Sequence, residues 1–293
     1  MKILITGDKG FVGTETKRLI DSGDADYYGI PHDVIGYDLM DGYDIRDPQQ
    51  LDQVVTETKP DRILHLAAVA RFSEADDNLK LTHETNVMGT MNVASVARKH
   101  KIPLVYASTG SVYMPIKEEP PITEDFKVIG NSTYGCSKAL GEKYVEEYCN
   151  PFIILRYAHL YGAEKRHHGL IGGFMDRIDR GLAPTLYGGK QSNDFTYIKD
   201  VARANLLALT LPWDGWNQAY NIGSGEELSA EEAGKIVCEH AGYDGEIEVK
   251  EQRGVDPQRF VYDMSKAESM LGFKADYSFA EGLKDMFDDS QNS

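Results

Sequence analysis

Cysteine is scarce in this chain of 293 residues, and long apolar runs are missing. The three cysteines, Cys136, Cys149 and Cys238, are unclustered and odd in number, which argues against a disulfide framework and a cysteine-based metal site. No apolar stretch approaches the roughly 20 residues that a membrane-spanning helix needs. Because the first predicted strand follows Met1 directly, we expect no signal peptide and a cytoplasmic location.

Basic residues are also few in comparison with acidic ones. Lys and Arg number 31 against 47 Asp and Glu, which gives a formal net charge of −16. Such an acidic chain is poorly suited to nucleic acid or to an anionic membrane surface, so we expect neither as a partner. The length is sufficient for one large domain or two closely joined ones, each with a substantial core.

The N-terminal segment combines a strand, a glycine-rich turn and a helix. An apolar run at residues 2–6 leads into Gly7-Asp-Lys-Gly10-Phe-Val-Gly13 and then into a helix-compatible stretch. This order presents backbone N–H groups and a helix N-terminus to a pyrophosphate. A second apolar run ends in Asp38, whose carboxylate can bind both ribose hydroxyls and repel a 2′-phosphate, favouring NAD over NADP. Asp38 could instead be a turn residue.

A second motif lies near the middle of the chain. Tyr134 and Lys138 are four positions apart, and Thr109 precedes them by twenty-five. Side chains at i and i+4 share one helix face, so the phenol and the ammonium can act on the same small volume. We expect the lysine cation to lower the pKa of the tyrosine, so that it can exchange a proton with a hydroxyl held by Thr109. These residues indicate redox chemistry at a carbinol carbon, which requires a nicotinamide.

Strand-like and helix-like segments alternate through the first half of the chain. The predicted strands are residues 2–6, 34–37, 62–68, 104–108 and 152–156, and the predicted helices are 14–21, 48–58, 82–101 and 134–148. Repeated βα units predict an α/β fold with a Rossmann-type, doubly wound parallel sheet and ligands at the carboxyl ends of its strands. The residues at such ends are Gly7, Asp38, Ala67 and Thr109.

The pattern becomes less regular after Gly162. We expect residues 1–162 to form the NAD-binding domain, with residues 195–222 returning to it. Residues 163–194 and 223–293 would then form a smaller α/β C-terminal lobe that binds the substrate.

Further motifs are spread along the chain: His65-Leu-Ala-Ala68, Asn86-x-x-Gly89-Thr90, Ser108-Thr109-Gly-Ser-Val-Tyr113, Arg156-Tyr157 and Asn221-Ile-Gly-Ser-Gly225. With the glycine-rich turn and the Tyr–Lys pair, they make the chain resemble the nucleotide-sugar epimerase/dehydratase branch of the extended short-chain dehydrogenase/reductase superfamily. The resemblance covers nearly the whole chain and implies NAD as cofactor and a nucleotide sugar as substrate. It also implies Tyr134 as catalytic acid/base, Lys138 as its tuner and a ligand of the nicotinamide ribose, and Thr109 as a proton-relay hydroxyl.

The resemblance implies a cofactor site along the strand ends and the Tyr–Lys helix. Its residues would be Gly7, Gly10, Phe11, Val12, Gly13, Asp38, Asp44, Ile45, Leu66, Ala67, Ala68, Asn86, Ser108, Tyr134, Lys138 and Tyr157. Asp44 and Ile45 match the pair that flanks the adenine, and Tyr157 matches a residue of the nicotinamide pocket. By the same resemblance, we expect a homodimer whose interface includes the Tyr–Lys helix.

The two residues that follow Thr109 differ from the pattern of the dehydratase relatives. Those relatives usually carry a Glu two positions after the hydroxyl residue, where it handles the proton at sugar C5, but this chain has Gly110 and Ser111. A serine without a base cannot easily do that work. The departure favours a 4-epimerase, which oxidises C4 and returns the hydride, unless Glu118 or Glu119 supplies the acid.

Two other functions stay open from the sequence. One is a dehydratase or oxidoreductase of the same family that acts on an atypical sugar or a small carbonyl compound. The other is a cofactor-binding regulator without turnover, although such a protein would need only the glycine-rich turn and Asp38 and has no use for the Thr109–Tyr134–Lys138 set.

The predicted substrate-binding residues are Arg71, Ser111, His159, Asn193 and Arg253. Asn193 stands where relatives often carry a phosphate-binding Arg, His159 stands where they carry Asn, and Arg253 matches the remaining phosphate-binding Arg. The lost arginine could be replaced by a nearby basic residue, or the substrate carries less phosphate or none. The replacements considered are Arg166, His167, His168 and Arg259. For Arg71, a solvated loop position is an equally good interpretation.

No metal site is expected. His167 and His168 are adjacent, so their side chains point apart on a strand or a helix, and no third ligand follows at a suitable spacing.

Overall fold

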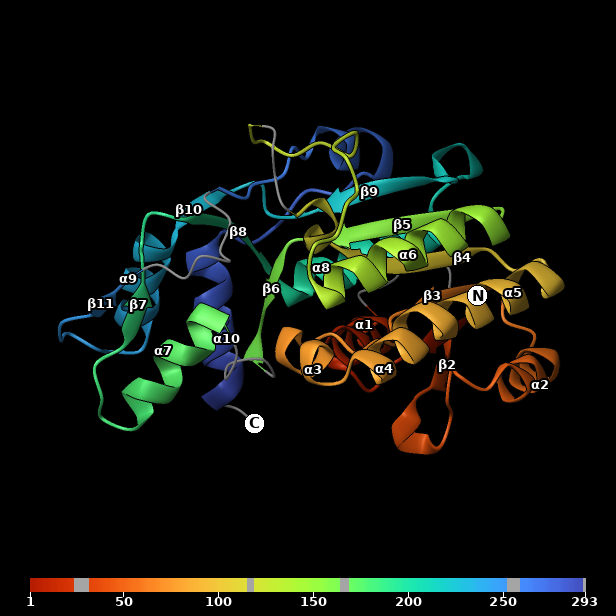
Figure 1. Ribbon diagram of the computed structural model, residues 1–293, viewed down its shortest axis with the longest axis horizontal. Coiled ribbons are helices and arrows are strands. Elements are labelled where there is room, and N and C mark those ends of the chain that lie inside the picture. Colours follow the sequence, from red (N-terminus) through yellow and green to blue (C-terminus); the bar gives the residue numbers. More distant parts are fainter. Residues whose placement is uncertain (24–31, 115–118, 164–168, 252–258, 292–293) are drawn as a thin grey trace.

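The computed structural model describes residues 1–23, 32–114, 119–163, 169–251 and 259–291. Within these ranges the chain forms a six-stranded sheet flanked by helices and a smaller lobe beside it (Figure 1). No helix of the described ranges combines the length and the apolar character that crossing a membrane would take.

The central sheet has the strand order β2-β1-β3-β4-β5-β9, and every neighbouring pair is parallel. Its strands are β1 Lys2–Thr6, β2 Asp33–Tyr37, β3 Arg62–His65, β4 Leu104–Thr109, β5 Phe152–Tyr157 and β9 Gln218–Ile222. The chain leaves β1 toward β2 on one side and continues with β3 on the other. In doubly wound sheets the crevice for ligands lies at such a reversal, here at the carboxyl ends of β1 and β3. The predicted doubly wound α/β fold is confirmed.

Helices cover both faces of the sheet (Figure 1). α1 Phe11–Asp21 and α8 Ile198–Thr210 pack together on one face, while α2 Pro48–Thr58, α5 Thr90–His100 and α6 Thr133–Tyr148 cover the other. Within β1, Ile3 and Ile5 pack in the core on the side of α1 and α8, and Leu4 packs in the core on the side of α2, α5 and α6. Strands buried on both faces read as continuous apolar runs, which is why the sequence located them well.

The predicted helix over residues 82–101 is not one regular helix. α4 Leu79–Thr82 leads into a π-helical turn, His83–Gly89, before α5 begins at Thr90. Tertiary contacts hold this turn in place. The buried Asn86 amide accepts from Val69 N at 2.7 Å and donates to Val69 O at 3.0 Å. Such π turns are frequent at functional sites.

The smaller lobe contains two short sheets and three helices. β6 His159–Tyr161, β8 Ser192–Tyr197 and β10 Glu227–Ser229 form one sheet, and β7 Thr185–Tyr187 pairs with β11 Glu248–Lys250 in the other. The helices are α7 Gly169–Asp179, α9 Ala230–His240 and α10 Phe279–Gln291. The expected boundary at residue 195 lies inside β8, which pairs with strands of this lobe, whereas α8 and β9 pack in the central domain.

Five short elements complete the described chain, and four of them are α3 Phe72–Asp77, the 3₁₀ turns Leu39–Asp41 and Gly110–Tyr113, and the π turn Ala267–Leu271. The first three follow strand ends of the central sheet, so they surround the crevice. A further 3₁₀ turn, Trp213–Gly215, precedes β9 at the opposite end of the strands.

Candidate active site

The glycine-rich turn packs so tightly that Gly7 and Gly13 have no room for a side chain. Gly7 has a φ of +73°, and a Cβ there would lie 2.8 Å from Ala67 Cα. A Cβ on Gly13 would lie 2.4 Å from Gly7 O. Gly10 is the N-cap of α1 and has no side chain to cap the first N–H groups of this helix. The turn therefore offers a helix N-terminus and bare backbone to an anion, which fits the pyrophosphate of a dinucleotide.

Asp38 lies at the end of β2, next to this turn. Its carboxylate accepts hydrogen bonds from Met40 N at 2.9 Å and from Lys9 N at 3.1 Å, so it caps the turn that follows it. Asp38 therefore caps a turn and also lies at a strand end that suits the binding of a ribose. Asp44 N donates to Gln50 Oε1 at 2.8 Å, and Ile45 is buried against Gly89.

A buried chain of hydrogen bonds ties the ends of β1 and β3 together. Thr90 Oγ1 donates to Asn86 O at 2.6 Å, so it accepts from His65 Nε2 at 3.0 Å. His65 Nδ1 is then left to accept from Thr6 Oγ1 at 2.7 Å, which assigns a neutral imidazole. Burial, with a contribution from the Lys138 charge, lowers the pKa of His65 to about 3. His65 is therefore a fixed strand-end residue and no proton donor at neutral pH.

The structure brings Tyr134, Lys138 and Thr109 together. α6 begins at Thr133, where Ser132 caps it by accepting from Gly135 N at 3.0 Å. Tyr134 is half-buried, and Phe72 packs edge-on against it at 5.4 Å between ring centroids. Lys138 is 3% exposed, with Nζ 4.1 Å from the centroid of the Tyr106 ring.

The pKa of Tyr134 departs from its usual value in the direction opposite to the predicted one. Burial raises the pKa of Tyr134 to about 12, although a hydrogen bond with Thr109 lowers it in part. Burial also lowers the pKa of Lys138 to about 7, although the charge of Glu142 raises it in part. Loss of water around both groups disfavours both charged forms and outweighs their proximity.

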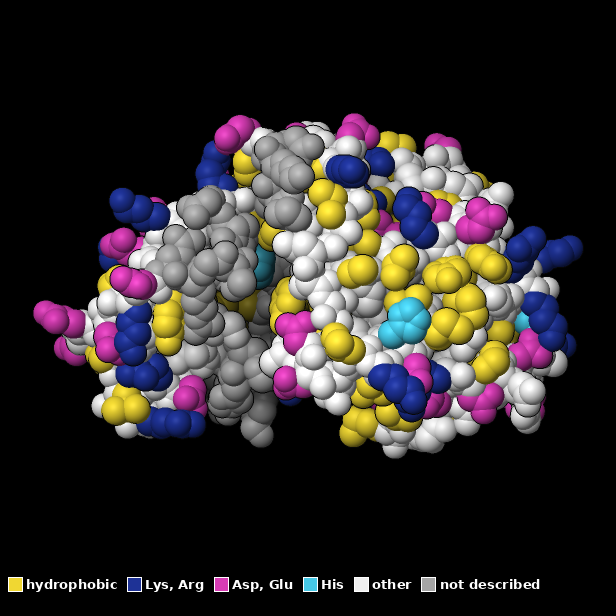
Figure 2. All heavy atoms as spheres, in the orientation of Figure 1, with side chains coloured by type: hydrophobic (Ala, Val, Ile, Leu, Met, Phe, Trp, Pro, Cys, Tyr) yellow, Lys and Arg dark blue, Asp and Glu magenta, His cyan; other side chains and the backbone are white. Residues whose placement is uncertain are grey.

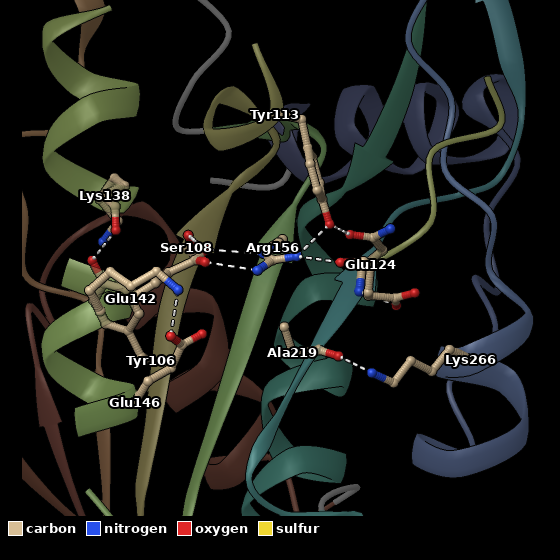
Figure 3. A network of polar contacts seen from close by, with 12 residues as sticks. Tyr106, Ser108, Tyr113, Glu124, Lys138, Glu142, Glu146, Arg156, Ala219 and Lys266 are labelled. Carbon is tan, nitrogen blue, oxygen red and sulfur yellow. Dashed lines mark hydrogen bonds and ion pairs between the residues drawn. The ribbon is translucent and has the colours of Figure 1, made fainter. Parts of the chain in front are cut away.

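A buried polar network extends from α6 into the sheet (Figure 3). Glu142 is 0% exposed and accepts from Arg156 Nε at 3.0 Å and Nη2 at 2.8 Å, and from Ser108 Oγ at 2.5 Å. Arg156 Nη1 also donates to Tyr113 Oη at 2.7 Å, and Tyr113 Oη donates to Asn221 Oδ1 at 2.8 Å. Glu142 was not among the predicted site residues, although its place eight positions after Tyr134 puts it on the same helix face.

Three predicted cofactor residues turn their side chains away from the crevice. The Asn86 amide is bonded to the Val69 backbone and to Ser137 Oγ. The Ser108 hydroxyl donates to Glu142, and the Tyr157 hydroxyl donates to Asn205 Oδ1 at 2.6 Å. All three are less than 6% exposed. These side chains connect neighbouring elements of the site, and their contact with the cofactor stays a prediction.

The predicted substrate residues are only partly described. His159, on β6, is flanked by Phe260 at 5.4 Å and Phe195 at 6.2 Å between centroids, and desolvation lowers its pKa to about 4 even though the side chain reaches solvent. Asn193 lies on β8 and is half-buried, and Arg71 is exposed just before α3. Arg253, Glu118, Arg166, His167 and His168 lie outside the described residues. In the described part of the chain, no group of three or more His, Cys, Asp or Glu could hold a metal ion.

Comparison with known proteins agrees with this geometry. Residues 3–223 match the NAD dependent epimerase/dehydratase family. The chain belongs to this family. A protein of Methanocaldococcus jannaschii, provisionally named a UDP-glucose 4-epimerase, is 32% identical over 96% of both chains.

Two solved structures are similar over the full length of this chain. UDP-glucose 4-epimerase of Thermotoga maritima, solved with UDP-glucose, has a TM-score of 0.87, 27% identity and 99% of its own chain covered. DesIV of Streptomyces venezuelae, a dTDP-glucose 4,6-dehydratase solved with NAD, has a TM-score of 0.88, 26% identity and 98% covered. The protein is therefore an enzyme of the epimerase/dehydratase type, and its cofactor is NAD.

Proposed function

We propose that the protein is an NAD-dependent nucleotide-sugar 4-epimerase. The observation that carries this proposal is the packing around Gly110. A Cβ on Gly110 would lie 2.3 Å from Phe260 Cζ and 2.8 Å from Tyr262 Oη. The Asp or Ser that dehydratase relatives often carry between the hydroxyl residue and the Glu two positions after it has no room at Gly110, because Phe260 is 1% exposed and held by the surrounding aromatic cluster.

Of Glu118 and Glu119, the two acids named for elimination, only Glu119 is among the described residues. Ser111 accepts from Thr109 Oγ1 at 3.3 Å and brings no base of its own. Glu119 has a side chain that is 93% exposed and lies 3.7 Å from Arg259 on the surface. Among the described residues no carboxylate is hydrogen-bonded to Thr109, so we expect the C5 proton to stay in place and the oxidised sugar to take its hydride back.

In the proposed reaction, Tyr134 exchanges the proton of the C4 hydroxyl, with Thr109 holding the same oxygen. NAD, when bound, would supply the acceptor for the C4 hydride and a positive charge that favours the phenolate form of Tyr134. The glycine-rich turn holds the pyrophosphate, and Asp38 the adenosine ribose. After the keto sugar has turned over in the pocket, Tyr134 returns the proton to the oxygen and C4 regains its hydride on the opposite face.

The substrate's diphosphate would depend on few described cations. His159 is neutral above pH 4, and Asn193 carries no charge. Arg259 donates to both carboxylate oxygens of Glu227 at 2.7 Å, so it is already paired. These observations favour, as a second candidate, an oxidoreductase or dehydratase of this family on a sugar with less phosphate. They also leave Arg253 as the predicted phosphate ligand.

We expect the protein to form a homodimer through α6. Phe72, Leu79, Met88 and Leu140 are each 39–62% exposed. Figure 2 shows apolar side chains gathered on the face of α5 and α6. Sedimentation velocity should give a dimer for the native chain and a monomer for Leu140→Glu. A native monomer at micromolar concentration would contradict this expectation.

The function is tested by incubating the purified protein, without added cofactor, with UDP-, dTDP-, GDP- and CDP-sugars. A 4-epimerase yields an isomer of unchanged mass, detected by mass spectrometry and proton NMR. In D₂O the isomer should carry no solvent deuterium, because the substrate's own hydride returns to C4. Loss of water, or deuterium at C5, would reject the argument from Gly110. Conversion of a phosphate-free sugar alone would favour the second candidate.

A further inference from the structure

The Glu142–Arg156 ion pair lies directly behind the Tyr–Lys motif and has no part in the reaction described above. Both side chains are almost fully buried, at 0% and 5% exposed. Burial by itself lowers the pKa of Arg156, but its hydrogen bonds and ion pair with Glu142 leave it well above the usual value. Three donated hydrogen bonds hold the carboxylate in one orientation. Such a buried pair contributes little net stability, so stability alone does not account for it.

Glu142 stands one helical turn after Lys138 on α6. The described hydrogen bonds of its carboxylate go to Ser108 and Arg156, so it acts on the Lys138 ammonium through space rather than by direct contact. Figure 3 shows Lys138 and Glu142 on the same side of α6, with Arg156 on the neighbouring strand.

Three further titratable groups of the described residues lie close to Lys138 or on its helix, and they carry no charge at neutral pH. From β4, the ring of Tyr106 lies under Nζ. From β3, His65 is held neutral by its two threonine partners. On α6 itself, burial keeps Tyr134 protonated. The protonation of Lys138 is therefore influenced by the carboxylate of Glu142 and, behind it, by the guanidinium of Arg156.

We propose that Glu142 and Arg156 form a charge-setting pair for Lys138, in which the carboxylate keeps the buried ammonium protonated and the guanidinium limits this effect. Glu142 is thus a positioning residue, because it touches neither substrate nor cofactor. The proposal rests on the proposed function for its catalytic consequence: the active site works with a charged Lys138 and loses activity as pH rises through the titration of this group.

Two single substitutions of this pair should move the titration of Lys138 in opposite directions. Glu142→Gln removes the negative charge and leaves Arg156 uncompensated, so Lys138 should lose its proton about one pH unit lower. Arg156→Gln leaves Glu142 uncompensated, so Lys138 should lose its proton about one pH unit higher. The double variant should return close to the native midpoint. A purely structural pair would not give opposite signs.

The titration is followed by NMR of ¹³C,¹⁵N-labelled lysine in the full-length protein, without and with NAD, and Lys138→Met assigns the signal. Glu146→Gln is the matched control, because it changes the charge of the same helix at an exposed pair with Lys143 and should leave the midpoint unchanged. The pH profile of kcat/KM is measured in parallel and should move with the NMR midpoint.

Equal shifts in both single variants, or none, would overturn the proposal. If Glu142→Gln does not fold, the comparison of Arg156→Gln with the double variant still decides, since the second must titrate lower than the first. The NMR readout needs no substrate. A protein without epimerase activity that shows opposite shifts would therefore contradict the proposed function and leave the charge-setting pair standing.

Discussion

Tyr134→Phe should lower turnover by about 10³-fold while the protein keeps its fold and its NAD. The substitution removes the phenolic oxygen that exchanges the C4 hydroxyl proton and leaves the ring, which packs against Phe72. Because burial keeps this phenol largely protonated without ligand, its removal changes no net charge in the resting site. The loss should therefore appear in kcat, with a smaller change in KM.

The measurement is steady-state epimerisation of the substrate found in the nucleotide-sugar panel, together with NAD affinity and thermal unfolding. Tyr144→Phe is the matched control, because Tyr144 lies on the same helix and packs against Tyr148 at 6.0 Å between centroids. It should retain native activity. Turnover of Tyr134→Phe within tenfold of the native rate would remove Tyr134 from the mechanism.

Gly13→Ala is expected to weaken NAD binding and to destabilise the fold. The new methyl group would lie 2.4 Å from Gly7 O and 2.6 Å from Asp8 Cα, and backbone atoms on the inner side of the turn cannot move aside. Overpacking of this kind costs about 1–3 kcal/mol, and a turn displaced by it loses its alignment with the pyrophosphate. NAD affinity should fall by about 10- to 100-fold.

Calorimetric titration with NAD and thermal unfolding measure these two effects. Gly173→Ala is the control, because a Cβ there meets no atom within 4 Å and the residue lies inside α7. Alanine is the better helix former by about 1 kcal/mol, so this variant should unfold at a slightly higher temperature and bind NAD normally. Normal NAD binding by Gly13→Ala would show that the turn is not the pyrophosphate site.

Several elements could be predicted because their signals are local. The β1 strand and the α2 helix have the predicted bounds, residues 2–6 and 48–58. β1 is buried on both faces and therefore continuously apolar. α2 begins with Asp47 as N-cap, accepting from Gln49 N and Gln50 N, and with a proline in its first turn. The helix predicted over 82–101 differs because its π turn depends on Val69 and Ile45, which lie far away in sequence.

The active site likewise has features that the sequence predicts and features that it does not. The spacing of Tyr134 and Lys138 on one helix face is a property of four consecutive peptide units, and the sequence was sufficient to predict it. The direction of the pKa shifts was not predictable, because desolvation sums over every atom packed around a group. The partners of the Ser108 and Tyr157 hydroxyls, Glu142 and Asn205, could not be predicted either, because they lie on other elements.

From the sequence alone came the doubly wound sheet, the NAD cofactor and the pairing of a tyrosine with a lysine, because periodicity, glycine spacing and helix faces are set within a few residues. Only the tertiary structure decided that Phe260 fills the space beside Gly110, and that Glu142 meets Arg156 behind Lys138. Both contacts join segments distant in the chain. Close packing and the loss of water that goes with it arise only when those segments come together.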